Sequence, residues 1–157
     1  MNSSQLGQLG GIFAVLVFWH FFADWAFQSQ EEAFAKAKNK KVRAWHCFKY
    51  AIMFAPLAFF VSPHAMIFSF LLLFVSHYVI DSYVPVMLWA KYLRKAPQFK
   101  VMVVDPNTRL VMGRRSDEES FKEFASQPLG LILMIVMDQF FHIACLLPVA
   151  YATLGPR

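Results

Sequence analysis

Four long apolar segments alternate with polar ones along this chain of 157 residues. None of the four carries a continuous polar face at the helical repeat, which argues against a soluble amphipathic bundle. A helix needs about 20 residues, with a range of about 17–25, to cross the hydrocarbon core of a bilayer. We therefore predict an all-α membrane protein, a bundle of four transmembrane helices in a single domain, residues 1–157. The predicted spans are residues 10–27, 44–61, 65–90 and 128–151.

The polar segment between the third and fourth spans, residues 91–126, is long enough to have structure of its own. Its sequence "FKVMVVDPNTRLVMG" has two short β-rich runs around the turn signal "DPNT", which predicts a small hairpin. Ser116 and Glu119 follow at capping-box spacing and predict an amphipathic helix on the cytoplasmic membrane surface. A lid over a site and a plain surface element are both open roles for this insertion.

Other local signals concern breaks and extensions of the spans. The first span is expected to continue as an amphipathic helix through residues 28–38. Pro56 and Pro85 lie inside the second and third predicted spans, where a kink is tolerable if neighbouring groups satisfy the freed carbonyl.

The charges are few and clustered. Only 16% of the residues are charged and 58% are hydrophobic, whereas a soluble domain has about 25% charged residues. The net charge of +5 comes from residues 31–43, with five Lys or Arg, and from residues 91–126, with eight. Basic loops stay in the cytoplasm. We therefore predict a multi-pass membrane protein with both termini outside and the two basic segments in the cytoplasm, and no nucleic-acid partner.

The candidate functional groups are polar side chains inside the apolar segments. An aspartate at a helix centre costs roughly 2.5–3.5 kcal/mol on insertion scales, yet the four segments contain three aspartates, each with a histidine four positions away. The pairs are His20 with Asp24, His77 with Asp81, and Asp138 with His142. Residues four apart lie on one helix face.

The order within the pairs matches one site shared by antiparallel helices. Histidine comes first in the two inward spans, and aspartate comes first in the outward span. All three aspartates are therefore expected nearer the cytoplasm, with the histidines one turn, about 6 Å, deeper. The second span adds His46 near its cytoplasmic start. His64, in the predicted external turn, receives no role.

Imidazole and carboxylate ligands together suit Zn²⁺ most, with Fe²⁺ or Mn²⁺ as alternatives. Seven groups exceed the needs of one tetrahedral ion, so a dinuclear centre is expected. The predicted ligands are His20, Asp24, His46, His77, Asp81, Asp138 and His142, of which Asp24, Asp81 and Asp138 are also the candidate catalytic residues. Gln28, Tyr50 and Gln139 are expected to orient the ligands. Lys40, Lys41 and Arg43 form a basic cluster at the mouth, open to either anion binding or lipid contact.

The motifs "HFFADWAFQ", "HYVID" and "DQFFH", in this order and with His46 between the first two, resemble a family of small bacterial and phage inner-membrane proteins known as a domain of unknown function. The resemblance spans about residues 15–147. More distantly, the chain is similar to predicted membrane-bound metal-dependent hydrolases. A lysine often follows the third-span motif in the family, whereas this chain has Ser82 and Tyr83 there. The resemblance implies a location in the bacterial inner membrane, with both termini periplasmic. It also implies a fold and a site, and no demonstrated reaction.

The leading hypothesis is an intramembrane metal-dependent hydrolase acting from the cytoplasmic side. A metal-activated water would attack a phosphoester or ester of a lipid-like or phosphorylated small molecule. A proton or metal-ion transporter or channel is the first alternative, and a non-catalytic membrane effector with a structural metal is the second. The lipid bilayer and a homo-oligomer are the other expected partners.

Overall fold

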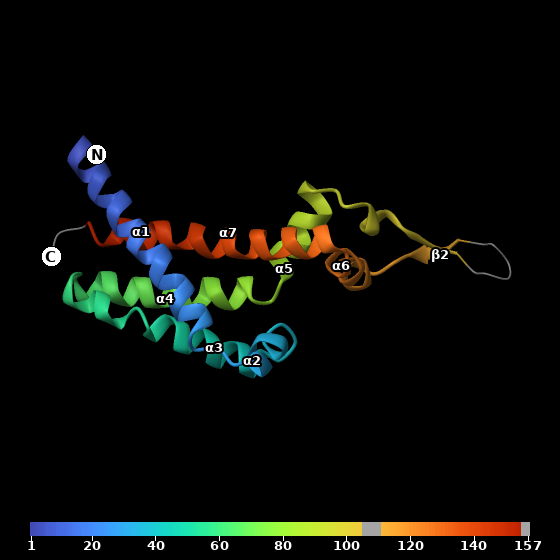
Figure 1. Ribbon diagram of the computed structural model, residues 1–157, viewed down its shortest axis with the longest axis horizontal. Coiled ribbons are helices and arrows are strands. Elements are labelled where there is room, and N and C mark those ends of the chain that lie inside the picture. Colours follow the sequence, from blue (N-terminus) through green and yellow to red (C-terminus); the bar gives the residue numbers. More distant parts are fainter. Residues whose placement is uncertain (105–110, 155–157) are drawn as a thin grey trace. The chain divides into compact units, whose positions relative to one another are not determined.

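The computed structural model describes residues 1–104 and 111–154, and the chain is mostly helical (Figure 1). Two compact units form: unit 1 comprises residues 1–82 with the chain from Phe140 onward, and unit 2 comprises residues 83–139. The elements are α1 (Ser3–Trp25), α2 (Gln30–Ala35), α3 (Lys40–Ile52), the 3₁₀-helix η1 (Ala55–Phe59), α4 (Pro63–Ile80), α5 (Val84–Leu88), the π-helix η2 (Trp89–Leu93), the 3₁₀-helix η3 (Pro97–Lys100), β1 (Met102–Val104), β2 (Val111–Arg114), α6 (Asp117–Ser126) and α7 (Pro128–Ala152). The two units are defined by their internal packing, and the single transmembrane domain of residues 1–157 stays a prediction.

Three helices, α1, α4 and α7, are long and apolar enough to cross a membrane. Their surfaces expose large apolar side chains, among them Phe18 at 74%, Ile67 at 60% and Ile132 at 57% of their area. Exposed apolar surface of this extent is typical of contact with lipid or a partner rather than water. The predicted apolar helices are confirmed in these three segments.

The second predicted span does not form one continuous helix. The α-helix α3 has 13 residues and ends at Ile52, and the 3₁₀-helix η1 follows. Pro56 explains the end point, because a proline ring clashes with the carbonyl four residues earlier, here that of Ile52. Trp19 Nε1 donates a hydrogen bond of 2.9 Å to the carbonyl oxygen of Met53, just after the break.

Two further boundaries differ from the predictions. The predicted third span, 65–90, breaks at Ile80, and Tyr83 has a left-handed φ of 58°. Pro85 then lies in the first turn of α5, where its missing N–H costs nothing, so the predicted kink is wrong. The prediction that the first helix continues through residues 28–38 is also wrong, because Ser29 caps a separate helix, α2, in a capping box with Glu32.

Unit 1 contains both an apolar core and a polar cluster. The helices α3 and α4 run side by side, and α1 contacts α3 (Figure 1). One core of buried apolar side chains includes Leu16, Phe54, Leu73 and Leu146. Each of these residues is four positions along the chain from a histidine or tyrosine of the cluster described below.

Unit 2 contains the insertion. Strands β1 and β2 pair antiparallel, with Met102 opposite Arg114, which confirms the predicted strand pairing. The "DPNT" residues, 105–108, lie outside the described residues. Ser116 caps α6 in a capping box with Glu119, as predicted. Phe99 and Phe124 lie in the core of this unit.

Candidate metal centre

Six of the seven predicted ligands lie buried in unit 1, none exposing more than 3% of its area. Local helix geometry explains how each element contributes, because buried positions recur every three or four residues. On α1 they are Leu16, His20, Ala23 and Asp24, and on α4 they are Ser69, Leu73, His77 and Ile80. The six are His20 and Asp24 from α1, His46 from α3, His77 from α4, Asp81 directly after it, and His142 from α7.

Three donor atoms converge at the middle of this cluster. His46 Nε2 lies 3.0 Å from Asp24 Oδ1 and 3.1 Å from His77 Nε2. His77 Nε2 lies 3.4 Å from the same Asp24 oxygen. Asp24, His46 and His77 are thus a buried group whose donor atoms are close enough together to hold one metal ion.

A fourth donor, Asp81 Oδ2, lies 3.4 Å from His77 Nε2 and 3.5 Å from His46 Nε2. A tetrahedral Zn²⁺ with bonds of about 2.0–2.1 Å places its ligand atoms about 3.3–3.4 Å apart. The five donor separations, 3.0 to 3.5 Å, bracket this value. A second possible ligand group, Cys47 with His77 and Asp81, shares two of the same residues.

Lys36 also enters the cluster, which the sequence analysis did not predict. Its ammonium Nζ lies 3.1 Å from Asp81 Oδ1 and 3.8 Å from Asp24 Oδ1. It donates a hydrogen bond of 3.2 Å to Gln28 Oε1. The charge pattern had placed Lys36 among the loop lysines, and no sequence signal distinguishes it from the exposed Lys38 two residues later.

The charges and hydrogen bonds of the cluster fit a further cation. With neutral imidazoles, the two carboxylates of Asp24 and Asp81 and the ammonium of Lys36 sum to −1. A buried net charge is costly, and a divalent cation together with one anionic partner would bring this sum to zero. Among the described residues, neither Asp81 oxygen accepts a hydrogen bond of good geometry, and His77 Nδ1 has no hydrogen-bond partner.

A second layer lies one helical turn along α1 and α3. His20 Nδ1 lies 2.9 Å from the Tyr50 hydroxyl. The Tyr50 ring stacks on His77 with centroids 3.9 Å apart, and the His142 ring lies 4.2 Å from His77. These rings hold the imidazole of His77 on several sides, so the predicted orienting role of Tyr50 has a contact to support it.

The helix α2 brings Lys36 to the cluster and is fixed by one ion pair. Lys49 Nζ lies 2.7 Å from Glu32 Oε2 and donates to the carbonyl oxygen of Phe27 at 2.9 Å. Burial raises the pKa of Glu32, but the hydrogen bonds from Lys49 and Ser29 outweigh it and hold this pKa below its ordinary value.

The remaining predicted residues lie elsewhere. Asp138 and Gln139 belong to unit 2, where Gln139 Nε2 donates a hydrogen bond of 3.3 Å to Asp138 Oδ2. Their roles at the centre stay predictions. Of the three basic residues expected at the mouth, Lys40 and Lys41 are exposed and Arg43 is buried.

Residues 12–156 match a protein family described as "Protein of unknown function (DUF3307)". The chain belongs to this family. The resemblance to a domain of unknown function is thereby confirmed, and DUF3307 membership names no reaction. Comparisons with curated proteins and with solved structures find no match. The function of this DUF3307 chain must therefore be argued from the cluster itself.

Proposed function

We propose that the protein is a metal-dependent hydrolase in which Asp24, His46 and His77 hold one divalent ion, Zn²⁺ first, with Fe²⁺ or Mn²⁺ as alternatives. The observation that carries the proposal is the set of three donor separations, 3.0, 3.1 and 3.4 Å, among Asp24 Oδ1, His46 Nε2 and His77 Nε2, which are buried and come from three helices. Catalytic zinc sites use three protein ligands and keep the fourth position open. The second ion of the predicted dinuclear centre is not needed for this function.

The ion would supply Lewis-acid chemistry and an activated water. Asp81 is the best candidate for the general base, because its carboxylate faces both imidazoles and lacks a well-formed hydrogen bond from the described residues. Lys36 Nζ, 3.1 Å from Asp81 Oδ1, would stabilise negative charge that develops on a substrate beside the general base. These roles suit hydrolysis of an ester or phosphoester.

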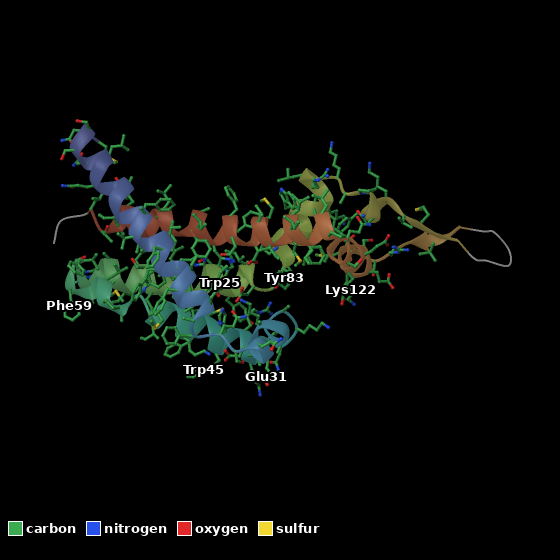
Figure 2. The ribbon with its side chains drawn as sticks, viewed as in Figure 1. Trp25, Glu31, Trp45, Phe59, Tyr83 and Lys122 are labelled. Atoms are coloured by element: carbon green, nitrogen blue, oxygen red, sulfur yellow. The ribbon has the colours of Figure 1, made fainter. Side chains whose placement is uncertain are left out.

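We also infer that the protein spans the bacterial inner membrane four times. The nine residues of α3 from Ala44 to Ile52 rise about 14 Å and the five of η1 about 10 Å, together most of the roughly 30 Å of a hydrocarbon core. Trp45 and Phe59, near the two ends of this segment, are 57% and 86% exposed (Figure 2). The basic segments would be cytoplasmic and both termini periplasmic, with a lipid-like substrate entering from the inner leaflet.

The transport alternative requires a polar path beyond the histidines. Four of the ring residues instead each have a buried apolar residue four positions away in the chain. The pairs are His20 with Leu16, Tyr50 with Phe54, His77 with Leu73, and His142 with Leu146. An apolar layer of this kind opposes the passage of ions or protons, which favours a closed reaction site.

The first test is metal content. The protein, purified in mild detergent, is expected to carry about one equivalent of a transition metal by mass spectrometry. His46→Ala should lose it, and His64→Ala, which removes an exposed histidine, should retain it. A metal-free wild type after incubation with Zn²⁺, Fe²⁺ and Mn²⁺ would contradict the proposal.

The second test separates a catalytic metal from a structural one. Asp81→Asn should retain the metal and lose roughly 10²–10⁴-fold of the hydrolysis of a chromogenic phosphoester or ester. A wild type that holds metal and hydrolyses none of a broad panel would favour the non-catalytic effector.

A further inference from the structure

Arg43 is a buried guanidinium that forms no ion pair with the residues that the structure describes. Only 6% of its area is exposed. Its Nε and Nη1 atoms donate to no described residue. It packs over the Tyr78 ring, with the guanidinium carbon 4.7 Å from the ring centroid.

This arrangement is costly unless a ligand completes it. An arginine side chain stays protonated inside a protein, and burying an unpaired charge costs several kcal/mol before compensation. A cation–π contact attracts the charge but leaves the N–H donors of the fork unsatisfied. A phosphate oxyanion satisfies two of those donors at once, because its geometry matches the planar guanidinium.

The position of Arg43 relates this anion site to the metal centre. Arg43 precedes His46 by three residues and Cys47 by four on the buried face of α3, a rise of about 4.5–6 Å along the helix. Tyr78, against which it packs, directly follows His77 on α4. Both elements that hold Arg43 therefore also carry a candidate metal ligand.

We propose that Arg43 binds the phosphate group of the substrate, so that the hydrolase acts on phosphoesters rather than on carboxylic esters. This inference rests on the proposed function for the reaction, but not for the anion site itself. The exposed Lys40 and Lys41 lack the burial that makes Arg43 selective. The phosphate can belong to a lipid headgroup or to a water-soluble ester, which share this chemistry.

Binding of inorganic phosphate to the detergent-purified chain, measured by isothermal titration calorimetry, tests the site. Arg43→Gln should raise the Kd at least tenfold, since a charge-assisted bidentate contact is lost. Lys38→Gln removes an exposed charge from the same basic segment and should change the Kd less than twofold. Equal affinity in Arg43→Gln and wild type would overturn the inference, as would equal losses in both variants.

Folding and metal binding are read separately. Arg43→Gln should melt at the same temperature as the phosphate-free wild type or higher, because it removes an uncompensated charge. Should this variant not fold, Arg43→Lys keeps the positive charge but lacks the planar pair of guanidinium donors. Arg43→Lys should weaken phosphate binding severalfold. Unchanged binding in this variant would overturn the inference.

Repeating the titration after chelation distinguishes the two proposals. Arg43-dependent phosphate binding by a chain that never binds metal would sustain the anion site while the hydrolase fails. A chain that binds metal but binds phosphate independently of Arg43 would overturn the anion site while the hydrolase proposal stands. Displacement of phosphate by phosphatidate micelles but not by glycerol phosphate would assign a lipid headgroup, and the opposite result a soluble ester. Displacement by neither would overturn a substrate role for Arg43.

Discussion

His46 Nε2 and His77 Nε2 lie 3.1 Å apart in the middle of unit 1, although 31 residues separate them in the chain. Two imidazole nitrogens at this distance share one proton or one cation between them. Asp24 Oδ1 lies 3.0 Å from the first and 3.4 Å from the second. The contacts of Asp24 thus go to histidines of two other helices, which makes a shared centre, rather than separate His–Asp pairs, the organising feature.

Lys36 supplies positive charge to this centre, and replacing it should lower the melting temperature most when no metal is bound. Lys36→Met leaves the carboxylates of Asp24 and Asp81 less compensated, and breaking a buried ion pair costs about 3–5 kcal/mol. We expect a clear drop in melting temperature in chelator, and a smaller drop with metal, which replaces the lost charge. Lys38→Met is the matched control, and equal melting temperatures for the two variants would contradict this role.

Trp19 stabilises the break between α3 and η1. Its indole N–H donates to the Met53 carbonyl oxygen at 2.9 Å. Trp19→Phe should therefore reduce the free energy of unfolding by about 0.5–1.5 kcal/mol, measured by denaturant titration in detergent. Trp25, which is 64% exposed, provides the control Trp25→Phe, for which little change is expected.

The ion pair of Glu32 with Lys49 should make the attachment of α2 sensitive to acid. Because the folded-state pKa of Glu32 is lowered from its ordinary value of 4.5, its stabilisation is fully present above that value. It is lost as the pH falls through the lowered pKa. Lys49→Met should cost about 0.2–1 kcal/mol near pH 7, and this difference should shrink toward pH 3. A pH-independent difference in thermal melts would show that Lys49 acts otherwise.

Gly130 permits the close approach of α7 to the end of α6 within unit 2. A Cβ atom there would overlap the Phe124 carbonyl, so Gly130→Ala should destabilise unit 2 by about 1–3 kcal/mol. Gly11 has nothing within 4 Å of an added Cβ. Gly11→Ala in α1 should therefore be neutral or stabilising by up to about 1 kcal/mol. Hydrogen exchange of the α6 amides would locate the effect.

The sequence alone predicted the features that depend on composition or on contacts between residues close together in the chain. Apolar composition alone identified α1, α4 and α7, since a run of apolar residues leaves little choice of environment. The Ser116–Glu119 capping box predicted the start of α6, because the contacts involved are three residues apart. The four-residue spacing placed each histidine on the same face as its aspartate for the same reason.

Features that depend on contacts between distant segments could not be predicted from the sequence. Pro56 and Pro85 were visible, but whether each proline would kink a helix or end it depended on neighbours such as Trp19. Lys36 and Lys38 look alike in the chain, yet the turn after α2 buries one and exposes the other. Arg43 is likewise buried where Lys40 and Lys41 are not. Burial of a charge is set by what packs around it, and those partners come from other helices.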